Sequence, residues 1–157
     1  MALSKESIRS DYPLPVYNYR VEIGGETVAF SEVSGLTIAY ETTTYLESPT
    51  ASGAVGPSMM IMPGQATPPT ITLRKGIVAR TSVKHLYRWI STVQVNQVEK
   101  KDIYVRLCDE KGEAVISWKI GNAFPVKLDA PTFDAKSSDA AIETLELKAD
   151  YITIEEA

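Results

Sequence analysis

The side chains that could carry acid–base or nucleophilic chemistry are few in this sequence. The chain holds one histidine, His85, and one cysteine, Cys108, among 157 residues. A nucleophilic triad needs a base whose ring is oriented by a carboxylate, and His85 has the basic neighbours Lys84 and Arg88 instead. Cys108 precedes Asp109, whose negative charge disfavours the reactive thiolate. We therefore interpret both residues as structural.

Metal and cofactor motifs are also missing from the sequence. One cysteine and one histidine cannot complete a structural zinc site, and Asp134 and Asp139 lack the dense acidic spacing of a calcium loop. Neither a Gly-x-Gly-x-x-Gly nor a P-loop pattern occurs. The sequence thus predicts a protein that is not an enzyme and that needs no metal or cofactor. Its function must then depend on how its structural elements are arranged.

Composition indicates a globular protein. Hydrophobic residues make up 44% and charged residues 23% of the chain, and its length predicts one domain over residues 1–157. The net charge of -4 argues against a surface devoted to nucleic acid. No apolar run approaches the roughly 18 residues that span a bilayer, so no stable membrane insertion is expected. The first residues lack the apolar core of a signal peptide, which predicts a protein made and kept in the cytoplasm or released by another route.

Alternation of apolar and polar residues predicts that most of the chain is β-strand. Gly24 and Gly25 mark a two-residue hairpin turn. One helix is expected at about residues 81–94, with an apolar face formed by Val83, Leu86, Tyr87, Ile90 and Val93. The pattern predicts a mainly β fold, an antiparallel sandwich or barrel with one flanking α-helix. Strands are expected at about residues 16–23, 27–34, 36–46, 68–77, 103–108, 116–120 and 142–154.

Residues 47–69 differ from the rest of the chain. These 23 residues contain five prolines, three glycines and three methionines. Because proline and glycine at this density disfavour a regular central strand, we expect a long extended loop. Its middle is too apolar for a solvated loop, which indicates an interaction arm. The apolar residues are Met59, Met60, Ile61 and Met62.

The charges are unevenly distributed along the chain. Residues 74–88 contain five basic residues and no acidic one, whereas residues 129–157 contain eight acidic and two basic residues. Two interpretations remain open: two solvated faces, or complementary patches that direct self-assembly or docking to a charged partner. Trp89 lies off the predicted apolar helix face, where it either packs at a sheet edge or contacts a partner.

A set of ordered motifs resembles a known family. The motifs are MPGQ at 62–65, ITLRKG at 71–76, LYRWI at 86–90, DIYVRLCDEKGE at 102–113, WKIGNAFPVKL at 118–128 and AIETLEL at 141–147. Their order and spacing, from about residue 13 to residue 154, resemble the tail tube proteins of contractile phage tails. The similarity is greatest to those of phage-tail-like extracellular contractile injection systems.

The resemblance implies a structural function. The fold would be shared with the Hcp tube protein of type VI secretion, with two antiparallel sheets packed as a small barrel beside one helix. Six copies would form a ring, and stacked rings would form a hollow conduit inside a contractile sheath. Implied partners are further copies of the chain, the sheath protein, baseplate and cap or terminator proteins, and a cargo or tape-measure protein in the lumen. Two alternatives stay open: a baseplate paralogue that initiates the tube, and a small monomeric ligand-binding β-barrel.

Three surfaces are expected within such a tube. The apolar residues of 47–69 would form an inter-subunit loop. Lys84 and Arg88 would lie on the sheath-facing side of the helix. The lumen wall would be polar, and an acidic wall would let polyanions slide rather than bind. Its candidates are polar residues that alternate with apolar ones in the strands expected at 36–46 and 142–154: Glu41, Thr144, Glu146, Lys148 and Asp150.

Overall fold

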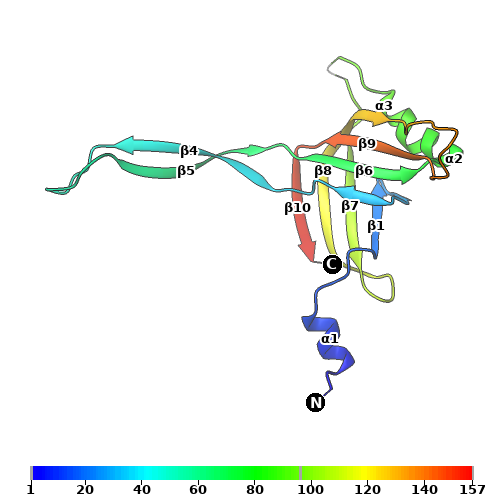
Figure 1. Ribbon diagram of the computed structural model, residues 1–157, viewed down its shortest axis with the longest axis horizontal. Helices are drawn as coiled ribbons and strands as arrows, with labels where there is room; N and C mark the ends of the chain where they lie inside the picture. The colour runs from blue at the N-terminus through cyan, green and yellow to red at the C-terminus, as the bar shows by residue number, and fades with distance from the viewer. Residues whose placement is uncertain (1, 96, 157) are drawn as a thin grey trace.

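Two antiparallel sheets pack against each other in the computed structural model, which describes residues 2–95 and 97–156. A long β-hairpin and, separately, a short N-terminal helix project from this body (Figure 1). The helical segments are α1 (Lys5–Asp11) and a continuous helix made of α2 (Ala79–Thr81), η1 (Ser82–Tyr87) and α3 (Arg88–Ile90). The strands are β1 (Tyr19–Ile23), β2 (Glu26–Val28), β3 (Glu32–Ser34), β4 (Ala39–Glu47), β5 (Ser58–Thr67), β6 (Thr70–Gly76), β7 (Lys101–Cys108), β8 (Ala114–Asp129), β9 (Ile142–Lys148) and β10 (Tyr151–Glu156).

Strand β8 belongs to both sheets. Its first part lies between β7 and β10 in sheet A, whose strand order is β2-β1-β7-β8-β10. Its second part, residues 124–129, pairs with β9 in sheet B, whose order is β3-β6-β9-β8. The change of sheet occurs at Asn122, which has a φ of 53°, and at Gly121, where a Cβ would lie 2.2 Å from the Tyr151 ring. In the described residues the sheets form an open sandwich, not a closed barrel.

The core lies between the two sheets and is made by alternate residues of their strands. Ile71 and Leu73 of β6 and Leu145 and Leu147 of β9 point inward from sheet B and are fully buried. Ile103 and Ile120 do the same from sheet A. Each such side chain stabilises the fold by about 1.5–3 kcal/mol through burial. The predicted turn at residues 24–25 is confirmed, since both glycines have positive φ and Ile23 pairs with Glu26.

The flanking helix is confirmed, but its end and its buried face differ from the prediction. It spans residues 79–90, and its middle turns are π-helix, whose i→i+5 bonds change which residues share a face. Leu86 and Trp89 are 1% and 2% exposed, whereas Val83 and Tyr87 are 47% and 60% exposed. The Trp89 Nε1 donates to the carbonyl of Glu99 at 2.7 Å. Trp89 is therefore a core residue and not a partner contact.

The C-terminal strand expected at 142–154 is two strands. β9 pairs with β6 and β8 in sheet B, and β10 pairs with the first part of β8 in sheet A. Between them the Asp150 N–H donates to the carbonyl of Gly121, so the chain crosses from one sheet to the other there. The crossing also shifts the alternation, because Ile152 is buried and Tyr151 is exposed.

Residues 47–69 are not a loop, contrary to the prediction. Residues 58–67 form β5, which pairs with β4, and only residues 48–57 form the connection. We call residues 39–67 the arm. Proline and glycine are tolerated because a two-stranded ribbon has no central strand, and Pro63 lies beside the register shift between Tyr40 and Thr42.

Helix α1 was not expected from the sequence. Ser4 caps it by accepting a hydrogen bond from the N–H of Ser7 at 3.1 Å, and the helix has no buried residue. Neither α1 nor the longer helix, in the part of the chain that is described, has the length and apolar character to cross a membrane.

The corrected helix face predicts a clear difference between two substitutions. Leu86→Ala should lower the free energy of unfolding by about 2–5 kcal/mol, because it leaves a cavity in the core. Val83→Ala should change it by less, about 0.5 kcal/mol, because about half of Val83 is exposed. Urea unfolding followed by circular dichroism measures both. Equal losses for the two variants would show that the assigned face is wrong.

Candidate assembly surfaces

The arm carries apolar side chains on both of its faces. Residues directly opposite in an antiparallel pair lie on the same face, so the register divides the arm into two sets. The first face holds Leu46, Met59 and Ile61, and the second face holds Tyr45, Glu47, Met60 and Met62. All of these are exposed except Glu47, which is half-buried.

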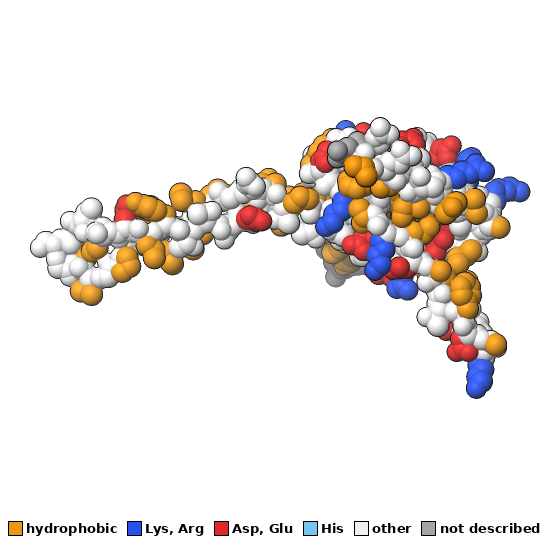
Figure 2. All heavy atoms as spheres, turned by 90° about the horizontal axis from the view of Figure 1, so that it is seen from above, with side chains coloured by type: hydrophobic (Ala, Val, Ile, Leu, Met, Phe, Trp, Pro, Cys, Tyr) orange, Lys and Arg blue, Asp and Glu red, His pale blue; other side chains and the backbone are white. Residues whose placement is uncertain are grey.

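An isolated two-stranded ribbon is marginally stable in water, and one face alone usually packs on a core. The arm instead extends away from the body, where it contacts little of its own chain (Figures 1 and 2). A surface of this kind requires coverage on both faces. The arrangement therefore fits insertion between two other surfaces better than docking on one.

Glycines fix the root of the arm. Gly35 has a φ of 87°, and a Cβ there would lie 2.1 Å from the carbonyl oxygen of Thr70. A Cβ on Gly64 would lie 2.9 Å from the carbonyl oxygen of Glu41, next to the register shift. These close approaches set the direction in which the arm leaves the body. Glu41 is thus an arm residue and does not lie on the strand that carries Glu146.

The helix presents basic and apolar residues to solvent. Of the five bases in residues 74–88, Lys75 is buried, with its Nζ donating to the carbonyl of Gly76 and to Thr81 Oγ1 at 3.0 and 3.2 Å. Arg74 lies on sheet B and pairs with Glu32. We call the remaining exposed residues the basic helix face: Arg80, Val83, Lys84, Tyr87 and Arg88. Lys84 and Arg88 are confirmed as exposed, and their contact with a sheath stays a prediction.

His85 lies on the inner side of the same helix. Its Nδ1 is 3.2 Å from Glu26 Oε2, so a carboxylate distant in sequence does orient the ring, which corrects the expectation of none. Cys108 is buried at the opposite end of β7 from this region. The described residues contain no cluster of three or more histidine, cysteine or acidic side chains that could hold a metal.

The outer face of sheet B is polar and balanced in charge. Thr144, Glu146 and Lys148 of β9 point away from the core, as predicted, and each lies between residues of β6 and β8. Ion pairs join Arg74 to Glu32 and Lys127 to Asp129, both at 3.3 Å, and Lys148 donates to Thr70. The face thus carries three bases (Arg74, Lys127, Lys148) and three acids (Glu32, Asp129, Glu146). The outer face of sheet B therefore does not form the acidic wall that was considered from the sequence.

Asp150 does not belong to that face. It follows β9 at the crossing between sheets, where Asn122 Nδ2 donates to Asp150 Oδ2 at 3.1 Å and Lys100 lies 3.7 Å from Oδ1. The sequence grouped Asp150 with Glu146 because the alternation continues through residue 149. The structure brings together only Thr144, Glu146 and Lys148 of the five lumen candidates.

The N-terminal helix is a further exposed element that sequence reasoning missed. Arg9 lies 3.5 Å from both Asp109 and Glu110, which attaches α1 to the turn between β7 and β8. Hydrogen bonds from the N–H groups of Glu113 and Lys111, together with Arg9, hold the pKa of Asp109 below its usual value. The signal in the sequence was the N-capping Ser4 before a run of helix-compatible residues.

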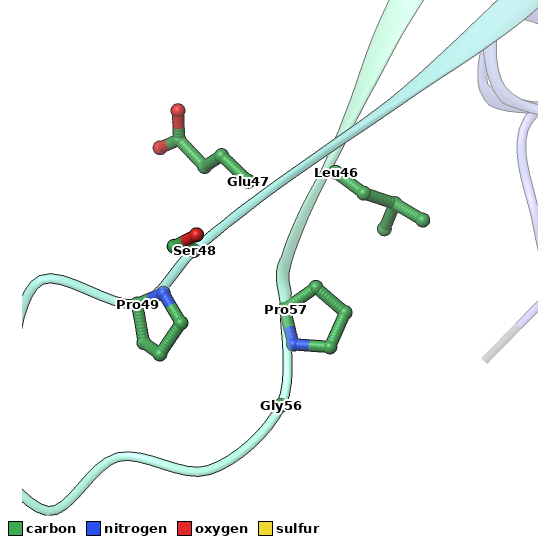
Figure 3. Close-up of a pocket in the computed structure, with 6 residues that line it drawn as sticks. All are labelled: Leu46, Glu47, Ser48, Pro49, Gly56 and Pro57. Carbon is green, nitrogen blue, oxygen red and sulfur yellow. The ribbon is translucent and has the colours of Figure 1, made fainter.

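A hollow of about 500 Å³ lies at the tip of the arm. It is lined by Leu46, Glu47, Ser48, Pro49, Gly56 and Pro57. Figure 3 shows the Glu47 and Leu46 side chains pointing to opposite sides, with the loop open between the two prolines. Polar groups do not converge in it, so it lacks the features of a small-molecule site.

Comparison with known proteins gives consistent matches along the chain. The family of the T4-like virus tail tube protein gp19 matches residues 15–153. A chain in the extended PVC sheath-tube complex, an extracellular contractile injection system, is 38% identical, with a TM-score of 0.88 over 99% of this chain and 100% of that one. A chain in the anti-feeding prophage tube terminating cap is 40% identical, with a TM-score of 0.84 over all of both chains.

A more distant match shows the fold alone. Hcp1 from Flavobacterium johnsoniae is 24% identical, with a TM-score of 0.52 over 88% of this chain and 95% of that one. No curated protein sequence matches the chain.

The exposed arm predicts a local difference in hydrogen exchange. In the unassembled protein, amides of β4 and β5 should exchange about a hundredfold or more faster than those of β7, because the arm opens without disturbing the core. In an assembled state the arm amides should slow. Hydrogen–deuterium exchange with mass spectrometry measures this. Arm amides as protected as β7 in the monomer would contradict the view that the arm needs a partner.

Proposed function

The chain belongs to the T4-like virus tail tube protein family, and we propose that it forms the inner tube of a contractile injection system. The observation that carries this function is the arm, whose two apolar faces require other copies or partners to cover them. The identity of 38–40% to chains of the PVC sheath-tube complex and the anti-feeding prophage cap supports it. The role is structural, and no catalytic step is part of it.

The edges of sheet B suggest how a ring closes. In the described residues its four strands end at β3 on one side and at residues 124–129 of β8 on the other, and neither outer edge is paired. Unpaired edges are a liability for a free chain, and closure into a ring removes them. A contact of unlike surfaces that closes by rotation makes a ring, and one that does not close makes a filament. Six copies per ring, stacked into a tube, use both kinds of contact.

The outer face of sheet B is then the wall of the channel. Its polar residues Thr144, Glu146 and Lys148 avoid the continuous apolar patch that would trap cargo. Because the acids and bases of this face balance, the wall neither attracts nor repels a passing chain by net charge. Glu41 and Asp150, which lie elsewhere, have no part in it.

The partners follow from the place of a tube in such a particle. The outside of the tube contacts a sheath protein, its ends contact cap or terminator and baseplate proteins, and the lumen holds a cargo or tape-measure protein. Assembly takes place in the cytoplasm, and the finished particle is released. The PVC and anti-feeding prophage relatives come from a sheath-tube complex and a tube terminating cap.

A terminator role is a second candidate, since the relative from the terminating cap is 40% identical. Copy number separates the two, because a tube protein is present in many rings and a terminator in one. Quantitative mass spectrometry of purified particles measures this ratio. The structure does not favour a ligand-binding barrel, because the sandwich of the described residues is open and the hollow at the arm tip lacks converging polar groups.

Substitutions on the first face of the arm should abolish assembly without unfolding the subunit. Burying an apolar side chain contributes about 1.5–3 kcal/mol, so Met59→Asp with Ile61→Asp should weaken association by about a hundredfold or more. Thermal stability of the monomer should stay within about 0.5 kcal/mol, because both side chains are exposed. Negative-stain microscopy of rings and tubes is the measurement. Val95→Asp, which replaces a still more exposed apolar residue outside the arm, is the control. Normal tubes from the arm variant would contradict the function of the arm.

The channel wall can be tested by thiol labelling of Lys148→Cys. The native Cys108 is buried and gives little background. A small methanethiosulfonate should label both the free subunit and the assembled tube, whereas a polymer-linked maleimide should label only the free subunit. Mass spectrometry counts the modified chains. Rapid labelling of tubes by the polymer reagent would place sheet B on the outside, and labelling by neither reagent would place it between copies.

A further inference from the structure

The basic helix face has unpartnered charge beside exposed apolar surface. Arg80, Lys84 and Arg88 form no ion pair with any described residue, and residues 74–88 contain no acid. Val83 and Tyr87 lie on the same exposed side and are about half solvated. A helix normally turns apolar residues such as Val83 and Tyr87 toward a core. This basic helix face therefore fits a surface of another chain that is both apolar and acidic.

The arm has the complementary composition. Its only charged side chains are Glu41 and Glu47, and residues 21–73 contain five acids and no base. Neither glutamate forms an ion pair within the described residues. Glu47 shares the second face of the arm with Tyr45, Met60 and Met62, whereas the first face carries no charge. The second face is thus largely apolar, with Glu47 at its distal end.

The spacing of the two surfaces is compatible. Residues two apart on a strand, such as Tyr45 and Glu47, are separated by about 6.6 Å. On the helix, Lys84 lies in η1 and Arg88 begins α3, so the two bases are about one turn apart. The flexible methionines Met60 and Met62 can adapt to the irregular surface around Val83 and Tyr87.

The second face of the arm and the basic helix face lie at opposite ends of the folded subunit. Strand β6 begins at the root of the arm and ends just before α2, and its seven residues span about 20 Å. Figure 1 shows the arm directed away from the end of the body that carries the helix. The arm therefore cannot reach its own helix, and a contact between them must join two copies.

We propose that the second face of the arm, Tyr45, Glu47, Met60 and Met62, docks on the basic helix face of another copy of this chain. Glu47 pairs with Lys84 or Arg88, and the methionines cover Val83 and Tyr87. This inference rests on the proposed function and specifies the surface that the arm meets. A contact between unlike ends of identical chains propagates from copy to copy, as tube growth requires. It also removes Lys84 and Arg88 from the sheath interface expected from the sequence.

Charge reversal tests the docking in full-length protein without a sheath. Glu47→Lys on the arm and the pair Lys84→Glu with Arg88→Glu on the helix should each raise the concentration needed for self-association at least tenfold. Combining all three substitutions in one chain restores opposite charges and should return association toward the wild-type value. Sedimentation velocity over a concentration series measures this, and thermal melting checks that each variant folds. Glu113→Lys and Lys136→Glu, exposed outside both surfaces, are matched controls.

The outcomes separate the docking from the function. If the wild-type chain self-associates and the helix variants do so at the same concentration, the docking is overturned and the tube function still stands. If those variants then failed to recruit the sheath protein, the helix would serve the sheath instead. A triple variant no better than either parent would also overturn the docking. A wild-type chain that stays a monomer at every concentration would contradict both the docking and the tube function.

Discussion

The structure depends on one constraint: a two-stranded ribbon that is apolar on both faces cannot be satisfied within a single chain. The backbone of the arm is paired only within the ribbon, and its side chains have no core of their own. Because an isolated two-stranded ribbon is marginally stable, burial against other chains supplies the stability that such an element lacks. The rest of the molecule forms the body from which the arm projects. Close backbone approaches at Gly35 and Gly64 fix the direction of the arm. The subunit is therefore completed by assembly.

The passage of β8 from sheet A to sheet B sets the positions of the other surfaces relative to the arm. Because one strand contributes to both sheets, the polar face of sheet B and the helix are held at fixed positions by a single core. Four of the six charges on the outer face of sheet B are paired, Arg74 with Glu32 and Lys127 with Asp129, so this face suits an exposed wall. Among the described residues, Lys84 and Arg88 on the helix and Glu47 on the arm form no ion pair, so these surfaces are suited to contact.

The sequence predicted the sheets well because a strand alternates strictly between two faces. The inward positions of Leu145 and Leu147 and the outward position of Glu146 follow from period two alone. The family could also be recognised from the sequence, since its motifs lie in regular elements along the chain. The mainly β fold and the flanking helix were confirmed, as was the turn at Gly24 and Gly25.

The errors arose where pairing between distant residues overrides local preference. Pro63 and Gly64 argue against a strand locally, yet β5 forms because β4 supplies its ladder. Trp89 was placed off the apolar helix face, but a π-helical segment and the Glu99 carbonyl bring it into the core. The crossing at Asp150 was hidden because both Tyr151 and Ile152 are apolar, which conceals the change of phase.

A cryo-EM map of the native assembled particle tests the central claim most directly. We expect each arm to lie between other copies with both of its faces covered, and the outer face of sheet B to line the bore. An arm that lies free on the outside, or that folds back with Met59 and Met60 in solvent, would contradict the claim that the subunit is completed by assembly.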